Sequence, residues 1–106
     1  MLQVHSPDGR YIVFDSLSAD GHIGLLDLDS GTVTDLGEGF FPAWSPDGTR
    51  IAFGMLDEEG GSDLYTMAAD GSDRNRLTSD PEFDTGPQWS PDGTTIDYWT
   101  WPPRDK

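Results

Sequence analysis

The tetrapeptide Ser-Pro-Asp-Gly occurs three times in this chain, and this repetition constrains the fold more than any other feature. The copies begin at Ser6, Ser45 and Ser90, so they lie 39 and then 45 residues apart. Each copy is followed shortly by the pattern Ile-x-Phe or Ile-x-Tyr, which is typical of a β-strand. Self-similarity at such a period indicates a repeat architecture in which each unit is one supersecondary motif.

The repeated tetrapeptide has the chemistry of a hairpin turn. Pro presets φ for the second position of a type I turn, Asp follows in the bridge region, and Gly supplies a left-handed residue. We therefore expect Asp8, Asp47 and Asp92 to shape turns and not to act in catalysis.

The segments between the turns predict two four-stranded units and half of a third. The predicted strands are 2–6, 11–16, 22–29, 32–36, 40–44, 50–56, 63–69, 74–78, 86–89 and 95–100. No long segment has a period of 3.6 residues, so we expect essentially no helix. The sequence predicts an all-β fold of β-propeller blades: two complete four-stranded antiparallel blades plus half of a third. The expected boundaries are about 1–38, 39–79 and 80–101, with a tail at 102–106.

Composition narrows the classes of partner. The 106 residues suit one domain, and 20 acidic against 6 basic residues give a net charge of −14. Such an acidic protein is not expected to bind nucleic acid or an anionic membrane, because both need clustered Lys and Arg. No apolar run is long enough for membrane insertion, and no signal peptide is recognisable at the N-terminus. The absence of cysteine excludes a disulfide framework.

The sequence offers little for catalysis, and we expect no enzyme. It has no cysteine nucleophile, no Gly-x-Ser-x-Gly elbow, no phosphate-binding loop and no zinc-ligand spacing. The histidines are His5 and His22. His5 occupies a repeat position that Trp fills elsewhere, so we expect it to pack. His22 follows a predicted turn and is expected to be exposed.

Carboxylates are the one abundant chemical group. An acidic loop carries Asp57, Glu58, Glu59 and Asp63, whose oxygens suit Ca²⁺, although the spacing does not match an EF-hand loop. The competing interpretation is a solvated loop without metal. Asp84 belongs to a second acidic segment, and we expect it to organise the loop before the next strand. No other cofactor is expected.

The second unit resembles the TolB-like β-propeller repeat, which also occurs in propeller domains of prolyl-oligopeptidase-type peptidases. The resemblance rests on Trp-Ser-Pro-Asp-Gly at 44–48, Ile-Ala-Phe at 51–53, Asp-Leu-Tyr at 63–65 and Arg-Leu-Thr at 76–78. The first unit departs from this pattern at His5 and lacks the Arg-Leu-Thr signature. The resemblance implies protein–protein contact in the bacterial envelope, and hence a periplasmic or extracellular location. The peptidases of this group carry their catalytic residues in a separate hydrolase domain.

The blade count raises a problem of closure. The resemblance implies a ring of about six blades or more, whereas this chain supplies two and a half. An open unit exposes two blade faces and a strand edge, which invites pairing. Three explanations remain: copies self-assemble, the chain is an excised piece of a longer propeller, or a terminal segment stabilises an open fragment.

The last predicted strand breaks the repeat. Asp97 stands where the earlier units have Ala52 and Val13, and the same face is expected to present Trp99 and Trp101. An acidic residue beside two tryptophans predicts a solvated interface. The alternative is that the tryptophans fold back over their own blade.

Two functions follow from these observations. The first is a non-catalytic interaction or self-assembly module that contacts another protein or further copies of itself. The second is a ligand- or calcium-binding accessory propeller of an enzyme, which needs a closed ring around a central channel.

Overall fold

The fold consists of short antiparallel β-strands. The structure is a computed structural model, and it describes residues 3–15, 21–56, 61–78 and 83–101. Within these ranges no helix forms, and thus none that is long and apolar enough to cross a membrane. The strands are β1 (Gln3–His5), β2 (Tyr11–Phe14), β3 (His22–Asp27), β4 (Val33–Glu38), β5 (Phe40–Trp44), β6 (Arg50–Leu56), β7 (Ser62–Ala68), β8 (Asn75–Arg76), β9 (Phe83–Trp89) and β10 (Ile96–Trp101).

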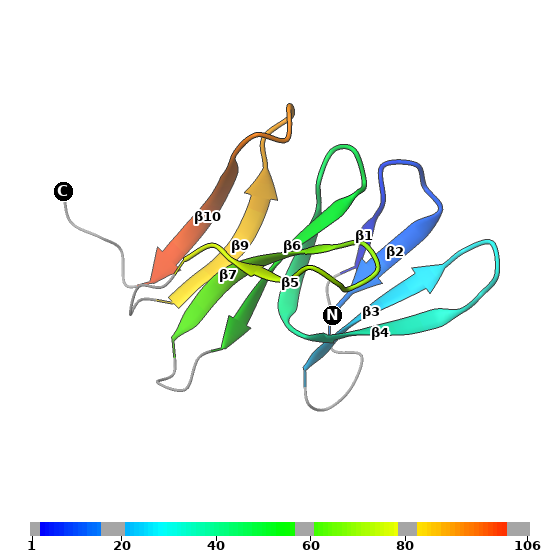
Figure 1. Cartoon of the computed structure of the whole chain (residues 1–106), viewed down its shortest axis with the longest axis horizontal. Coiled ribbons are helices and arrows are strands. Elements are labelled where there is room, and N and C mark those ends of the chain that lie inside the picture. The colour runs from blue at the N-terminus through cyan, green and yellow to red at the C-terminus, as the bar shows by residue number, and fades with distance from the viewer. Residues whose placement is uncertain (1–2, 16–20, 57–60, 79–82, 102–106) are drawn as a thin grey trace.

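The strands form two hydrogen-bonded sheets, β1 to β4 and β5 to β10, which follow one another along the molecule as two blades and a partial third (Figure 1). β1 to β4 form blade one, and β5 to β8 form blade two, each antiparallel with neighbouring strands paired in chain order. β9 and β10 form an antiparallel pair, which we call the third sheet. A parallel pairing of Ser62 with Phe83 joins it to β7. The predicted all-β fold with two complete blades and a partial third is confirmed.

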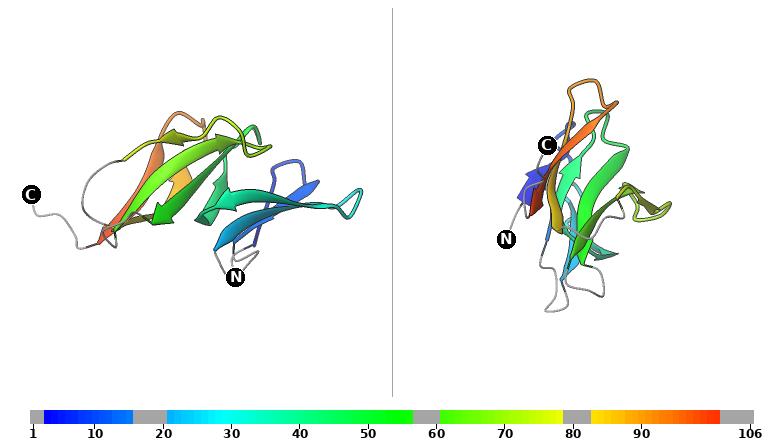
Figure 2. Two further views of the ribbon diagram at one scale, coloured as in Figure 1. Left: turned by 60° about the horizontal axis from the view of Figure 1, so that its bottom comes forward. Right: turned by 90° about the vertical axis from the view of Figure 1, so that its left-hand side faces the viewer.

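The sheets stand beside each other as twisted layers, as the turned views make clear (Figure 2). The main core lies between blades one and two. Blade one contributes Val13 and Ile23, and blade two contributes Ile51, Phe53 and Met67, all 0% exposed. Because side chains alternate across a strand, the residues beside Val13 point to the opposite face of blade one.

The fourth strand of blade two is shorter than the sequence predicts. β8 contains only Asn75 and Arg76, because the next ladder position uses a side chain. The backbone N–H of Leu64 donates to Oγ1 of Thr78 (3.0 Å), while the N–H of Leu77 donates to the carbonyl of Leu64 (2.7 Å). The Arg-Leu-Thr signature therefore bonds to the edge of β7 through one backbone N–H and one side-chain hydroxyl.

Each Ser-Pro-Asp-Gly segment forms the hairpin turn that was predicted. The Ser hydroxyl donates to Oδ1 of the Asp two residues later, at 2.5, 2.7 and 2.6 Å in the three copies. The same hydroxyl accepts the backbone N–H of the residue five positions after the serine, at or just before the start of the next strand. The glycines Gly9, Gly48 and Gly93 have φ of 75°, 74° and 75°, the left-handed region that favours glycine. The turn aspartates are confirmed as structural groups.

Candidate functional site

One contact between neighbouring blades is made twice in this chain. The indole N–H of Trp44 donates to the carbonyl of Val4 in blade one at 3.0 Å. The indole of Trp89 makes the equivalent bond to the carbonyl of Ala43 in blade two at 3.1 Å. In both cases the acceptor directly precedes the Trp position of its own repeat. The tryptophan of the repeat thus links blade two to blade one, and the third sheet to blade two, by a hydrogen bond.

The turns stack in the same order. A Cβ added to Gly48 would lie 3.5 Å from the ring of Pro7, and one added to Gly93 would lie 3.5 Å from the ring of Pro46. A Cβ added to Gly9 would have no described heavy atom within 4 Å. Among the described residues, the turn of blade one therefore has no neighbour on the side where the other two turns have one.

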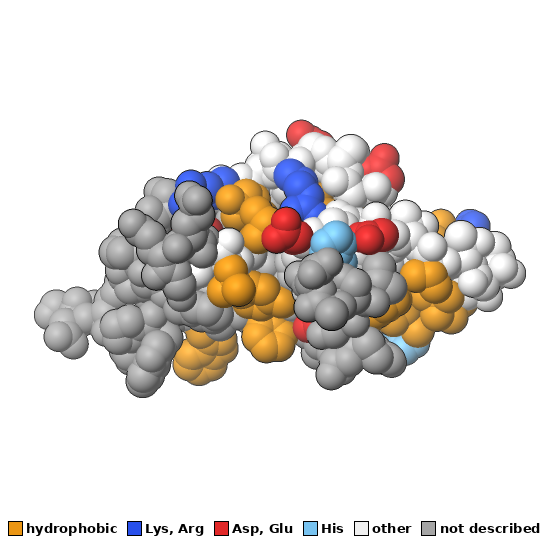
Figure 3. Space-filling view, turned by 90° about the horizontal axis from the view of Figure 1, so that it is seen from below, with side chains coloured by type: hydrophobic (Ala, Val, Ile, Leu, Met, Phe, Trp, Pro, Cys, Tyr) orange, Lys and Arg blue, Asp and Glu red, His pale blue; other side chains and the backbone are white. Residues whose placement is uncertain are grey.

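Blade one has an open apolar surface on its outer side, which we call the blade-one face. Leu28 is 46% exposed and Val33 is 50% exposed, and half-buried residues lie between them. Its members are His5, Ile12, Phe14, Leu26, Leu28 and Val33. Seen from below, one group of hydrophobic side chains lies toward the blade-one end of the molecule, and others lie nearer its middle (Figure 3). His5 is exposed, so the packing role expected for it is absent, because no described blade lies against it.

The opposite end carries the residues that the sequence predicted as an interface. Asp97 is exposed, and Trp99 is 77% exposed. We call these two residues, with the exposed Gln88 opposite Asp97, the third-sheet face. A register shift separates Asp97 from Trp99, and the indole of Trp99 lies against Gly86 of its own sheet, 3.1 Å from an added Cβ. The side chain of Trp101 lies outside the described residues.

The two complete blades contain equivalent pairs of one basic and one acidic side chain, with the acid on different strands. In blade two, the guanidinium of Arg76 donates to Asp63, which is 2% exposed. In blade one, Nδ1 of His22 lies 2.9 Å from the carboxylate of Asp35. The acid is on the third strand in blade two and on the fourth strand in blade one. The repeat pattern does not predict this reversal, and His22 was expected only to be exposed after a turn.

The predicted calcium ligands are only partly placed by the structure. Asp57, Glu58 and Glu59 lie outside the described residues, so calcium binding there stays a prediction. Asp63 is buried and accepts from Arg76 and from Thr78 Oγ1 (3.5 Å). Within the described part of the chain, no three His, Asp or Glu side chains form a group that could hold a metal ion.

Comparison with known proteins identifies the repeat. The sequence profile of the TolB beta propeller domain matches residues 1–100. The chain belongs to the TolB β-propeller family. The relatives include the Tol-Pal system protein TolB of Anaeromyxobacter dehalogenans (strain 2CP-C), 41% identical over 85 residues. The match covers 76% of this chain but only 19% of that relative, so this chain corresponds to a small part of a TolB protein.

Solved structures agree with this assignment. The structure of putative TolB from Agrobacterium tumefaciens superposes with a TM-score of 0.83 at 28% identity, over 95% of this chain and 39% of that one. The tricorn protease superposes equally well, with a TM-score of 0.83 over 99% of this chain and 11% of that one. At 16% identity the second likeness concerns the fold alone.

The turn aspartates of this TolB-type repeat are strongly acidic. Hydrogen bonds from Ser45 and Thr49 lower the pKa of Asp47 to about 2, and bonds from Ser90 and Thr94 do the same for Asp92. The pKa of Asp8 is also lowered, chiefly by its bond from Ser6. Each turn therefore carries a fixed negative charge at neutral pH.

These turns predict a specific acid sensitivity. A carboxylate whose pKa is depressed by folding stabilises the fold above its unfolded pKa, and this stabilisation is lost as pH falls toward its folded pKa. For Asp47 that window runs from 3.8 to about 2. We expect Asp47→Asn to be less stable than the wild type at neutral pH. The difference in the free energy of unfolding between the two proteins should shrink as the pH falls through this window. Urea unfolding at several pH values measures this. Asp97→Asn is the control, and an equal pH dependence of both variants would contradict the prediction.

Proposed function

We propose that the chain is a non-enzymatic interaction module that self-associates through its blade-one face and its third-sheet face. The observation that carries the proposal is the inter-blade contact, which is made twice among the described residues. Blade one and the third sheet each present one of the two surfaces that such a contact joins. Gly9 lacks the Pro ring that packs on Gly48 and Gly93. The carbonyl of Gln88 stands at the repeat position where Val4 and Ala43 accept an indole N–H.

The proposed association is head to tail. The blade-one face of one copy meets the third-sheet face of another, so His5 of the first lies near Gln88 of the second. Both ends present apolar surface, because Leu28, Val33 and Trp99 are 46%, 50% and 77% exposed. A head-to-tail contact joins two different surfaces, and it gives a ring when the rotation closes and an open chain otherwise.

Family membership adds context to this proposal. Relatives of this chain are named as Tol-Pal system proteins, and the TolB-like resemblance carries the expectation of protein contact in the bacterial envelope. The tricorn protease, which shares the fold, is 16% identical to this chain, and the sequence has neither a cysteine nor a Gly-x-Ser-x-Gly elbow. These points support a binding role over a catalytic one.

The test is the mass of the chain in solution. We expect light scattering after gel filtration to give a multiple of the 11.6 kDa chain mass. Self-repulsion of a chain with net charge −14 should make the association stronger at higher salt. A monomer at all protein and salt concentrations would contradict the proposal.

Variants locate the contact. Replacing Trp99 and Trp101 together by Ser should return the protein to a monomer, and Val33→Ser should weaken association from the other end. Leu56→Ser is the matched control, because Leu56 is 63% exposed but belongs to neither face. If Leu56→Ser and the double Trp variant change the mass equally, the assignment of the faces is wrong.

A further inference from the structure

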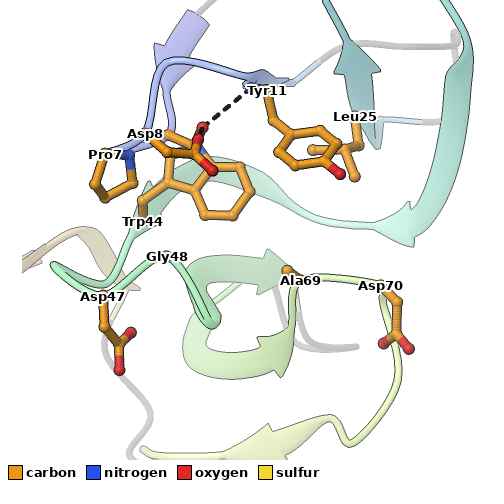
Figure 4. A pocket seen from close by; sticks show the side chains of 10 residues that line it. Pro7, Asp8, Tyr11, Leu25, Trp44, Asp47, Gly48, Ala69 and Asp70 are labelled. Atoms are coloured by element: carbon orange, nitrogen blue, oxygen red, sulfur yellow. Dashed lines mark hydrogen bonds between the residues drawn. The ribbon is translucent and has the colours of Figure 1, made fainter. Parts of the chain in front are cut away.

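A cavity of about 330 Å³ lies between the turns of blades one and two, away from both end faces. In Figure 4 the rings of Tyr11 and Trp44, with Leu25 beside them, form one side of it. The two ring centroids are 6.4 Å apart and the rings are tilted by 34°. The cavity has the size of a small-ligand site, for which about 300 Å³ is the usual lower bound.

The mouth of this cavity is acidic. Asp8 lies on the side of the rings, and Asp47 and Asp70 lie on the opposite side (Figure 4). Hydrogen bonds within the turns all go to Oδ1 of these carboxylates, which leaves Oδ2 of each able to accept from a ligand. The same bonds lower the pKa of all three groups, so the mouth is negatively charged at neutral pH.

The repeat supplies an internal comparison. A second cavity, of about 190 Å³, lies at the equivalent place between blade two and the third sheet. There Arg50 occupies the repeat position of Tyr11, and its guanidinium donates to Asp73 (2.9 Å) and to Thr66 (3.1 Å). Thr66 itself stands where blade one has Leu25. The second cavity thus carries its own guanidinium, and the first has none in its lining.

We propose that the cavity between blades one and two binds an alkyl guanidinium group supplied by another molecule. Aromatic faces attract guanidinium groups, and the apolar wall suits an alkyl stem. The carboxylates at the mouth attract the cation and exclude anions. In this proposal the ligand supplies a guanidinium to the first cavity, as Arg50 supplies one to the second cavity. This inference uses neither end face, so it does not depend on self-association.

The neighbouring cation of the protein itself does not occupy the cavity. The guanidinium of Arg10 lies 5.1 Å from the centroid of the Tyr11 ring, but Arg10 is absent from the cavity lining. It is held by Asp27 at 3.2 Å and by Asp29 at 3.6 Å. This contact demonstrates that the Tyr11 ring accepts a guanidinium as a neighbour, and the ion pairs fix that guanidinium elsewhere.

The test is an NMR titration of the whole chain with N-acetyl-arginine methylamide. We expect saturable shifts of the amide signals of Gly48 and Ala69, which line the cavity, and no shift at Gly93 of the second cavity. The citrulline analogue has the same shape without the charge, and it should cause no saturable shift. Equal shifts with both compounds, or no saturation with the arginine compound, would overturn the proposal.

Two substitutions at Tyr11 address the site directly. Tyr11→Arg copies the residue of the second cavity, so it should fill the site and abolish the saturable shifts. Tyr11→Leu keeps an apolar wall without an aromatic face and should weaken binding about threefold or more. The dispersed amide spectrum of each variant reports whether it is folded. Unchanged affinity in Tyr11→Leu would overturn the proposal even if Tyr11→Arg failed to fold.

The acidic mouth has its own matched pair of variants. Asp70→Asn should weaken binding about two- to fivefold at low salt, as expected for a solvent-exposed charge pair. Asp92→Asn changes a similar turn carboxylate that lines only the second cavity, so it should have no effect. Equal losses in both variants would point to unspecific attraction by the acidic surface and would contradict the proposal.

Two further titrations distinguish the source of the group. A Gly-Arg-Gly peptide represents an arginine side chain of a partner polypeptide, and agmatine represents a free guanidino compound. Preferential binding of the peptide would support a polypeptide partner, and preferential binding of agmatine would support a small-molecule ligand. Failure of both to shift the signals of Gly48 and Ala69 would contradict the assignment of the site.

Discussion

Replacing Trp44 by alanine is expected to lower the free energy of unfolding by about 3–5 kcal/mol, the usual cost of truncating a buried tryptophan. Trp44 is 8% exposed and belongs to the core between blades one and two. Its indole also donates to the carbonyl of Val4, so the variant loses a hydrogen bond between blades as well as apolar contact. Urea unfolding followed by circular dichroism measures the loss.

The repeat provides the control for this variant. Trp89 makes the same hydrogen bond but is only partly buried, because it borders an open cavity of about 470 Å³. Trp89→Ala should therefore cost clearly less than Trp44→Ala. Trp44→Phe should cost about 1 kcal/mol beyond its lost area, because it leaves the Val4 carbonyl without its donor. Equal costs at the two tryptophans would show that the core is not concentrated between the first two blades.

Arg76→Gln is expected to lower the free energy of unfolding by about 3 kcal/mol, the lower end of the range for breaking a buried ion pair. Asp63 has a side chain that is 3% exposed, whereas the side chain of Arg76 is 48% exposed. Among the described residues, removing the cation leaves the buried carboxylate with the hydroxyl of Thr78 as its hydrogen-bond donor. Water can reach the Arg76 side, which keeps the expected cost at the lower end.

The exposed pair between Arg10 and Asp27 is the matched control. Its side chains are 48% and 20% exposed, and Arg10→Gln should cost about 0–1 kcal/mol. Asp63→Asn in the Arg76→Gln background should recover part of the loss, because an amide is cheaper to bury than an unpaired carboxylate. Equal losses for Arg76→Gln and Arg10→Gln would contradict the importance of the Asp63 pair.

The sequence predicts local features of this fold well. The Ser-Pro-Asp-Gly turns depend on φ preferences and hydrogen bonds within six residues, so Pro7, Asp8 and Gly9 suffice to specify the first of them. The strands that follow the turns are predicted from the alternation of apolar and polar residues. All ten strands exist, and most of their ends agree with prediction to within one residue, while β9 begins three residues before the expected 86, where its start pairs with β7.

The sequence predicts contacts between elements less well. His22 and Asp35 are 13 residues apart and meet because β3 pairs with β4, which sets Asp35 opposite Gly24, two residues from His22. Their counterparts Asp63 and Arg76 lie 41 residues further on, two more than the turns, because an intervening loop is longer. Alignment by the turns alone therefore hides the equivalence of the two pairs.

One difference between the repeats in the sequence corresponds to the proposed guanidinium site. Tyr11 and Arg50 occupy the same repeat position, five residues after the serine of the turn. That difference carries no meaning until both positions are known to line a cavity between blades. The cavity depends on the packing of two sheets, which strand patterns do not specify.

The reversed placement of acid and base in the two pairs has a consequence for how the chain reaches its native connectivity. Blades of similar sequence can exchange strands during folding, so that β3 pairs with β8 and β7 with β4. Such an exchange would set the imidazole of His22 against the guanidinium of Arg76, and the carboxylate of Asp63 against that of Asp35. The native order instead pairs each carboxylate with a nitrogen donor. In each blade, the third strand can therefore form its acid–base contact with the fourth strand of the same blade but not with the fourth strand of the other blade.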